Sequence, residues 1–95
     1  MSYRVEFDKR AEKEILALEK SVRTFILRSL KEFEANFSPE YENELIKTEK
    51  IKHLKGSLSG LYRLRLRSFR VIYEKLNDTL IIYVLKVTDR KDAYR

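Results

Sequence analysis

The chain has 95 residues, no cysteine and a single histidine, which leaves room for one domain and excludes a disulfide framework, a thiolate nucleophile and a zinc site built on cysteines or several histidines. No apolar run approaches the ~20 residues that cross a bilayer, and the first residues lack the apolar core of a signal peptide, so we expect a cytoplasmic protein. The net charge of +6 is uneven: residues 1–50 carry 10 Lys or Arg and 11 Asp or Glu, whereas residues 51–95 carry 11 and 4. A basic half on a small domain indicates a polyanionic partner, most often a nucleic acid.

The first part of the chain predicts a strand and a pair of helices. Apolar residues alternate with polar ones over residues 3–7, which is typical of a half-buried strand. Asp8 can cap a following helix, and a second helical pattern runs to Phe37 after a short link, so we expect an antiparallel helical hairpin. Pro39 fits the first turn of a short helical segment. The acidic segment 40–50 is interpreted as a connection to the second half.

The second half predicts four strands. Alternation or apolar runs place them at residues 51–55, 61–67, 69–74 and 79–87. The last strand is nearly all apolar and should be central in the sheet. The order of elements predicts an α+β fold over a single domain, 1–95. After an N-terminal strand, an antiparallel two-helix hairpin is expected to pack on one face of a mostly antiparallel four- to five-stranded sheet.

Four arginines stand out in this half. Arg63, Arg65 and Arg67 alternate along one predicted strand, and Arg70 points away from the apolar residues of the next. If the helices cover the apolar face, all four arginines project from the open face. Their guanidinium groups repel one another, and an anionic ligand would relieve this repulsion because arginine binds phosphate through a planar, bidentate donor fork. The alternative is a solvated basic face whose charges block strand pairing.

The C-terminal segment and the histidine are further candidates. Arg90, Lys91 and Arg95 surround Tyr94, whose ring can stack on an unpaired base or, alternatively, pack on the sheet. Histidine titrates near neutral pH, so His53 is a candidate acid or base, although a lone histidine beside a strand is more often incidental. No pair of acidic residues has the spacing of a metal site, and we expect no metal and no cofactor.

Three segments together resemble the RelE/ParE superfamily of bacterial and archaeal toxins. They are HLKGSLSGLYRLRL (53–66), FRVIYE (69–74) and DRKDAYR (89–95). With the chain length, basic charge and order of elements, the resemblance covers essentially the whole chain. It implies a toxin that enters the ribosomal A site and cleaves mRNA without a metal, through attack of a 2′-hydroxyl on the adjacent phosphodiester to give a 2′,3′-cyclic phosphate. It also implies a cognate RelB-like antitoxin that neutralises part of the arginine set or displaces the C-terminal segment.

Carried over residue by residue, the resemblance implies the catalytic residues Arg63, Arg65, Arg70, Arg90 and Tyr94. The cations expected to bind RNA are Lys52, Lys55, Arg67, Lys86, Lys91 and Arg95. Guanidinium groups can stabilise the charge of the transition state, but arginine is a poor proton acceptor. Proton transfer is therefore open to Lys55, Tyr94 or His53.

Two other functions remain open. ParE-like members share the fold, inhibit DNA gyrase by protein contact and lack the set of RNase residues, which this sequence retains. A non-catalytic RNA-binding module would use the same basic face. The sequence also departs from some RelE-like members: it has arginines at two strand positions where they have lysines, and it lacks an acidic or glycine-rich turn before Phe69.

Overall fold

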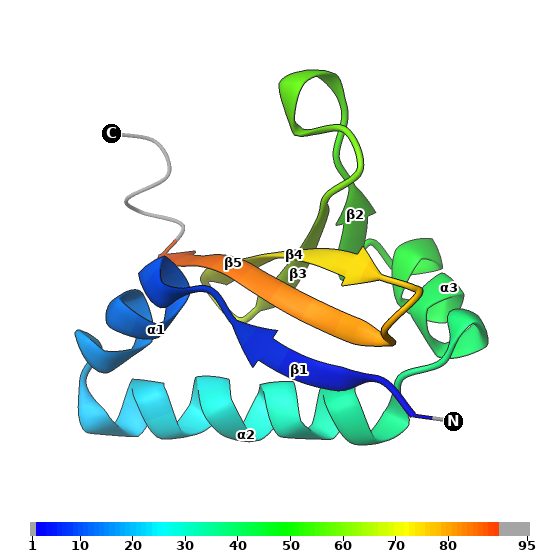
Figure 1. Cartoon of the computed structure of the whole chain (residues 1–95). Helices are drawn as coiled ribbons and strands as arrows, with labels where there is room; N and C mark the ends of the chain where they lie inside the picture. The colour runs from blue at the N-terminus through cyan, green and yellow to red at the C-terminus, as the bar shows by residue number, and fades with distance from the viewer. Residues whose placement is uncertain (1, 90–95) are drawn as a thin grey trace.

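The computed structural model describes residues 2–89, which form a five-stranded sheet and three helices (Figure 1). In chain order the elements are β1 (Arg4–Phe7), α1 (Lys9–Leu16), α2 (Lys20–Asn36), α3 (Pro39–Lys47), β2 (Ile51–His53), the 3-10 turn η1 (Gly56–Leu58), β3 (Tyr62–Leu66), β4 (Phe69–Leu76) and β5 (Ile81–Asp89). The strand order is β1-β5-β4-β3-β2, with β1 parallel to β5 and the other pairs antiparallel. The predicted α+β fold is confirmed. None of the described helices is long and apolar enough to span a membrane.

Two of the described helices, α1 and α3, begin where the sequence supplies a side-chain cap. The Asp8 carboxylate accepts a hydrogen bond from the Arg10 N–H at 3.1 Å, as expected for an N-cap of α1. Ser38 caps α3 in the same way through the Tyr41 N–H, and Pro39 occupies the first turn. The segment 40–50, expected to be a connection, is therefore mostly helix. Its acidic residues suit the start of a helix, where the backbone dipole favours negative charge.

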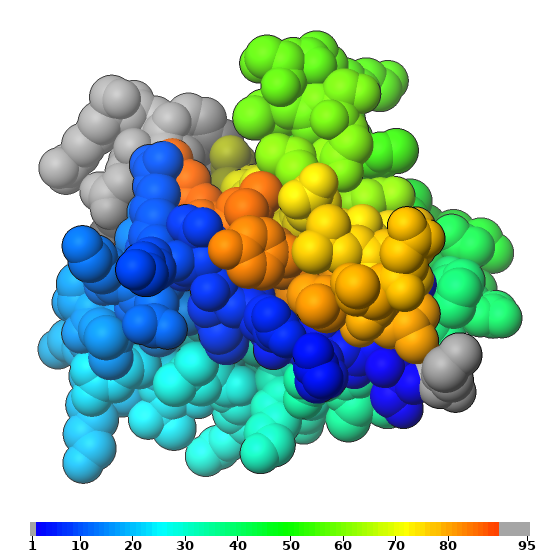
Figure 2. All heavy atoms as spheres, viewed as in Figure 1, coloured from blue at the N-terminus to red at the C-terminus, as the bar shows by residue number. Residues whose placement is uncertain are grey.

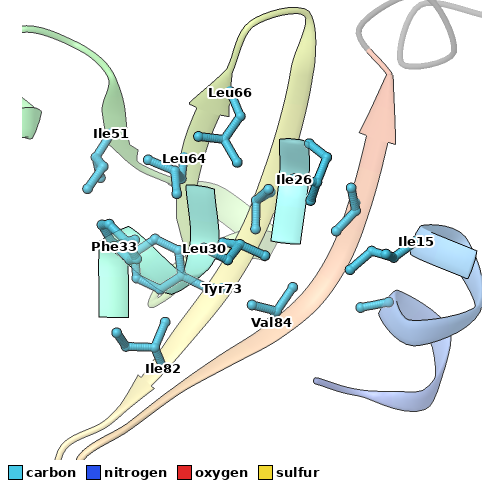
Figure 3. Close-up of a cluster of buried hydrophobic side chains, with 13 residues drawn as sticks. Ile15, Ile26, Leu30, Phe33, Ile51, Leu64, Leu66, Tyr73, Ile82 and Val84 are labelled. Carbon is cyan, nitrogen blue, oxygen red and sulfur yellow. The ribbon is translucent and has the colours of Figure 1, made fainter. Parts of the chain in front are cut away.

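The core lies between α2 and one face of the sheet. Figure 3 shows Ile26, Leu30 and Phe33 of α2 pointing at Tyr73 and Val84 of the central strands. The remaining buried apolar residues are Ala11, Ile15, Ile51, Leu64, Leu66, Val71, Ile82 and Val87. The expectation that the last strand is central is confirmed, because β5 lies between β1 and β4. One face of the sheet thus carries the core, and the opposite face is left for solvent or ligands.

Two glutamates of the helices accept hydrogen bonds from backbone N–H groups at the sheet edge. β1 is an edge strand, and its Val5 N–H donates to the Glu34 carboxylate of α2 at 2.8 Å. β5 extends beyond the end of β1, and there its Val87 N–H donates to the Glu14 carboxylate of α1, also at 2.8 Å. Satisfied donors cannot pair with another strand, so both contacts protect the edge while they tie the helices to the sheet.

The segment between β2 and β3 projects from the body of the molecule (Figures 1 and 2, green). The Leu54 N–H donates to the Leu61 carbonyl at 2.9 Å and closes its base. Gly56 and Gly60, the only two glycines of the chain, have φ angles of +69° and +93°, which glycine adopts without steric cost. The Leu58 side chain is exposed in this projection. The projection follows β2, whose Lys52 lies on the face of the sheet opposite the core.

Candidate nucleic-acid interface

The register of the sheet gathers cations on the face opposite the core. Arg65 of β3 is directly opposite Arg70 of β4, and Arg63 is opposite Lys52 of β2. Lys86 of β5 lies in the same cross-strand row as Arg63, on the far side of Ile72. We call these five side chains the basic face: Lys52, Arg63, Arg65, Arg70 and Lys86. They come from four neighbouring strands, which hold them at fixed spacings.

The Arg65–Arg70 pair is the centre of the basic face. Directly opposite residues of an antiparallel pair have Cβ atoms about 4.5–5.5 Å apart, and like charges in this position destabilise a sheet. The two arginines line a small hollow of about 150 Å³ together with Arg63, Arg67 and Ser68. Guanidinium groups around one hollow provide the planar, charged donors that bind a phosphate group.

Arg63 is oriented by the backbone. Its Nη2 donates to the Glu49 carbonyl at 2.9 Å, and its side chain is only partly exposed. Glu49 follows α3 and has φ +63°, a left-handed conformation that residues other than glycine rarely adopt. This turn aims the carbonyl at the guanidinium group. Arg63 is therefore less mobile than the exposed Arg65, and it forms one fixed wall of the hollow.

Arg67 does not follow the alternation that the sequence predicted. Strand pairing ends at Leu66 and Phe69, so Arg67 belongs to the two-residue turn and has φ +56°. Its guanidinium carbon lies 3.8 Å from the centre of the Phe25 ring of α2, a cation–π contact on the helix side. The expectation that its side chain shares the open face with the other arginines is wrong. Side chains alternate between faces only within a strand, and the chain has already entered the turn at Arg67.

His53 and Lys55 lie away from the hollow, which Arg67 still lines from the turn. His53 is opposite Tyr62, on the same side of the sheet as the core, and its ring stacks on that tyrosine. Lys55 is exposed where the projecting segment begins. The structure therefore does not bring His53 to the basic face, where it was considered as an acid or base. Arg90, Lys91, Tyr94 and Arg95 lie outside the described residues.

A buried polar cluster was missed by the sequence analysis. Glu42 of α3 is 3% exposed; it accepts hydrogen bonds from the Tyr73 hydroxyl at 2.6 Å and from Lys75 Nζ at 2.7 Å. Burial, and then the bond to Glu42, raise the pKa of Tyr73. Burial is the largest single effect on Lys75 and would lower its pKa, but the hydrogen bond and negative charge of Glu42, together with Tyr62, outweigh burial and the pKa is raised. These partners are 31 and 33 residues apart in sequence, so no local pattern reveals them.

No group of three acidic, histidine or cysteine side chains suited to hold a metal ion occurs within residues 2–89. The chemistry that the described residues offer is the binding of anions by a rigid set of cations. A flexible, extended anion such as a single-stranded nucleic acid fits a face that is open and has no deep cavity.

Comparison with known proteins gives consistent results. Residues 5–94 match the family model of the ParE toxin of type II toxin–antitoxin systems, parDE. The chain is 35% identical over 96 residues to a Methanocaldococcus jannaschii protein whose name assigns it to the RelE toxins, covering 100% of this chain and 98% of that protein. The crystal structure of an archaeal RelE–RelB complex from Pyrococcus horikoshii has 28% identity and a TM-score of 0.68, over 95% of this chain and 97% of that one. A RelB–RelE antitoxin–toxin complex from Methanococcus jannaschii has 26% identity and a TM-score of 0.66, over 93% of each chain.

Proposed function

The chain belongs to the RelE/ParE family of toxins from type II toxin–antitoxin systems, and from this premise we propose that it is a ribosome-dependent endoribonuclease that cleaves mRNA in the A site. The observation that carries the proposal is the Arg65–Arg70 pair at the centre of the basic face. Two guanidinium groups in directly opposite positions can donate hydrogen bonds to one phosphate that lies between them. Such a pair is expected of a site that acts on a phosphodiester.

In the proposed reaction the 2′-hydroxyl of one nucleotide attacks the adjacent phosphorus. The O2′–P bond forms, the P–O5′ bond breaks, and the leaving oxygen takes up a proton to become a 5′-hydroxyl. Arg65 and Arg70 would hold the phosphoryl oxygens, with Arg63 fixed beside them by the Glu49 carbonyl. Their charges oppose the charge that develops in the transition state. Arg90 and Tyr94, implied by the family resemblance, complete the proposed set.

Arginine is a poor proton acceptor, so this face lacks an ordinary general base. The enzyme would then depend on a substrate already held in the geometry for in-line attack. The toxin would need the ribosome because the ribosome presents the codon in this geometry. The cations Lys52 and Lys86 at the ends of the basic face are proposed to bind the flanking phosphates, and no metal or cofactor enters the reaction.

We also propose a cognate RelB-like antitoxin. The two solved structures reported above are complexes of RelE with RelB, and a basic face attracts an acidic partner through complementary charge. An antitoxin segment on the basic face would exclude RNA. A complex in which the antitoxin contacts neither the basic face nor the C-terminal segment would contradict this proposal.

The direct test is mapping of 5′ ends on a defined mRNA incubated with the purified protein, with and without translating ribosomes. Cuts are expected within A-site codons and only with ribosomes. Arg65→Ala should lower the cleavage rate roughly 10²–10³-fold, the usual loss for one transition-state donor. The matched control is Arg28→Ala, which removes the same charge from the exposed surface of α2 and should cleave normally.

A second function is favoured by the family model, which is that of ParE toxins. A ParE-like protein would inhibit DNA gyrase by protein contact without cutting RNA. Inhibition of gyrase supercoiling by the folded protein, combined with no cleavage in the mapping experiment, would establish this alternative. RNA binding without cleavage and without gyrase inhibition would instead indicate a non-catalytic RNA-binding module.

A further inference from the structure

Three aromatic rings form a column across the sheet on the side of the core. His53, Tyr62 and Tyr73 are opposite one another on β2, β3 and β4. The rings of His53 and Tyr62 are 4.5 Å apart with an angle of 4° between their planes, and those of Tyr62 and Tyr73 are 5.3 Å apart at 12°. Tyr73 is fully buried, whereas His53 is exposed on the edge strand. The column therefore begins in the core and ends in solvent.

The inner end of the column is held firmly. The Tyr73 hydroxyl is bonded to buried Glu42, and Lys75 Nζ lies 4.7 Å from the centre of the Tyr62 ring while it also bonds to Glu42. These contacts fix two of the three rings, and the third stacks on them. A rigid aromatic surface loses little conformational entropy when it binds another ring. The ring face of His53 that points away from Tyr62 has no aromatic neighbour among the described residues.

The charge around this ring suits a nucleic acid. Residues 50–73 contain seven Lys or Arg and no Asp or Glu. Successive side chains of a strand point to opposite faces and are about 3.3 Å apart along it. Lys52 is therefore on the basic face while His53, the next residue, is on the other, and both are exposed on the edge strand β2. A ligand that crosses this edge can contact both.

We propose that the exposed ring of His53 is a stacking site for an unpaired nucleobase of the RNA that the basic face binds. The RNA strand passes around the β2 edge, with a phosphate near Lys52 and Arg63 and a base on His53. This inference rests on the proposed function and deepens it, because it assigns single-stranded RNA to both faces of the edge strand. His53 then acts as a binding residue rather than as an acid or base. Stacking accepts any base, so the site contributes affinity and position more than sequence preference.

The test uses a 2′-O-methyl hexaadenylate, which lacks the attacking hydroxyl and cannot be cleaved by this reaction. His53 is the only histidine, so its ring protons are resolved by NMR without mutation. They are expected to shift upfield as the oligonucleotide is added, because an adenine ring stacks on them. His53→Ala should raise Kd roughly 5- to 100-fold, the range for one stacked base, and His53→Phe should restore binding. Leu58→Ala, exposed in the adjoining projection, is the matched control and should bind normally.

An abasic site introduced at successive positions locates the stacked base. At one position the abasic site should weaken binding as much as His53→Ala does. The abasic site and His53→Ala together should then raise Kd no more than either change alone. The inference is wrong if Arg65→Ala weakens binding while His53→Ala does not, or if His53→Ala weakens only the complex with the antitoxin. The inference is also wrong if the wild-type chain does not bind the oligonucleotide at all, whereas the proposed function is contradicted by the absence of cuts on translating ribosomes.

Discussion

At the scale of single residues, the four arginines between positions 63 and 70 differ in their contacts. Arg63 is fixed by a backbone carbonyl, Arg67 lies on an aromatic ring of α2, and Arg65 is exposed opposite Arg70. Four arginines that look equivalent in the sequence therefore have different environments. The proposed chemistry depends most on Arg65 and Arg70, because these are the pair that a bound phosphate would bridge.

The Glu42 cluster predicts how stability depends on pH. Tyr73 and Lys75 both have a raised pKa in the folded state, and the hydrogen bond from Tyr83 to Asp8 raises the pKa of Tyr83 as well. Above about pH 10 the unfolded chain loses these protons while the folded chain keeps them, so the unfolded state binds fewer protons and stability falls as pH rises. These three groups should therefore leave the guanidinium concentration at half-unfolding unchanged from pH 7 to 9. Between pH 10 and 11 they should lower it.

Tyr73→Phe tests the assignment. It removes the phenol that resists ionisation and should make the decrease above pH 10 shallower, although the variant is less stable at pH 8. Tyr3→Phe is the control, since the hydroxyl of Tyr3 donates its hydrogen bond at the exposed surface, to Asn77. An equal alkaline decrease in wild type and Tyr73→Phe would show that other groups dominate.

At the scale of elements, the helices stabilise the sheet through backbone donors as well as through the core. Glu34→Ala leaves the Val5 N–H of the edge strand without its acceptor, and a part-buried donor without a partner costs about 1–3 kcal/mol. We expect a lower free energy of unfolding and faster hydrogen exchange of the Val5 amide. Glu34→Gln keeps an acceptor oxygen and should recover most of the loss. Glu32→Ala, two residues earlier and on the exposed surface of the same helix, should change neither quantity.

The helix α3 shows how local signals position distant contacts. A capping serine, a proline in the first turn and early glutamates are sufficient to start a helix at Pro39. The helix supplies Glu42 to the buried cluster and leads into the Glu49 turn that fixes Arg63. One short element thus connects the core with the basic face. Its acidic composition alone suggested an exposed connection.

At the scale of the whole molecule, charge is divided between the layers. The first 50 residues, which form β1 and the helices, have a net charge of −1, and the remaining residues carry the entire excess. The five cations of the basic face predict strongly salt-dependent RNA binding. If each neutralises one phosphate of a single strand, log K should fall with log salt concentration with a slope of about −3.5.

Arg65→Ala should reduce that slope to about −2.8, because one phosphate contact is lost. Arg28→Ala, on the helix layer, should leave it unchanged. The measurement is binding of the uncleavable oligonucleotide between 50 and 300 mM salt, read by fluorescence anisotropy. A slope near zero, or an equal loss in both variants, would contradict binding on the basic face.

The sequence by itself determined the strands, the first two helices and the faces of the strand residues, but not α3. Alternation is a property of extended backbone, so residues two apart must share a face wherever a strand forms, and Arg63, Arg65 and Arg70 could be placed together on the open side. Caps and helical spacing likewise depend on near neighbours. These signals, with the family resemblance, were sufficient for the fold and for the strand arginines of the basic face.

Only the tertiary structure decided which distant residues meet. The burial of Glu42 against Tyr73 and Lys75, the contact of Arg67 with Phe25 and the stacking of His53 on Tyr62 and Tyr73 all join separate elements. Such contacts depend on strand order, on register and on where a turn ends the alternation. A side chain's local periodicity carries none of this information, because the free energy of each contact is gained only when the whole sheet and its helices are assembled.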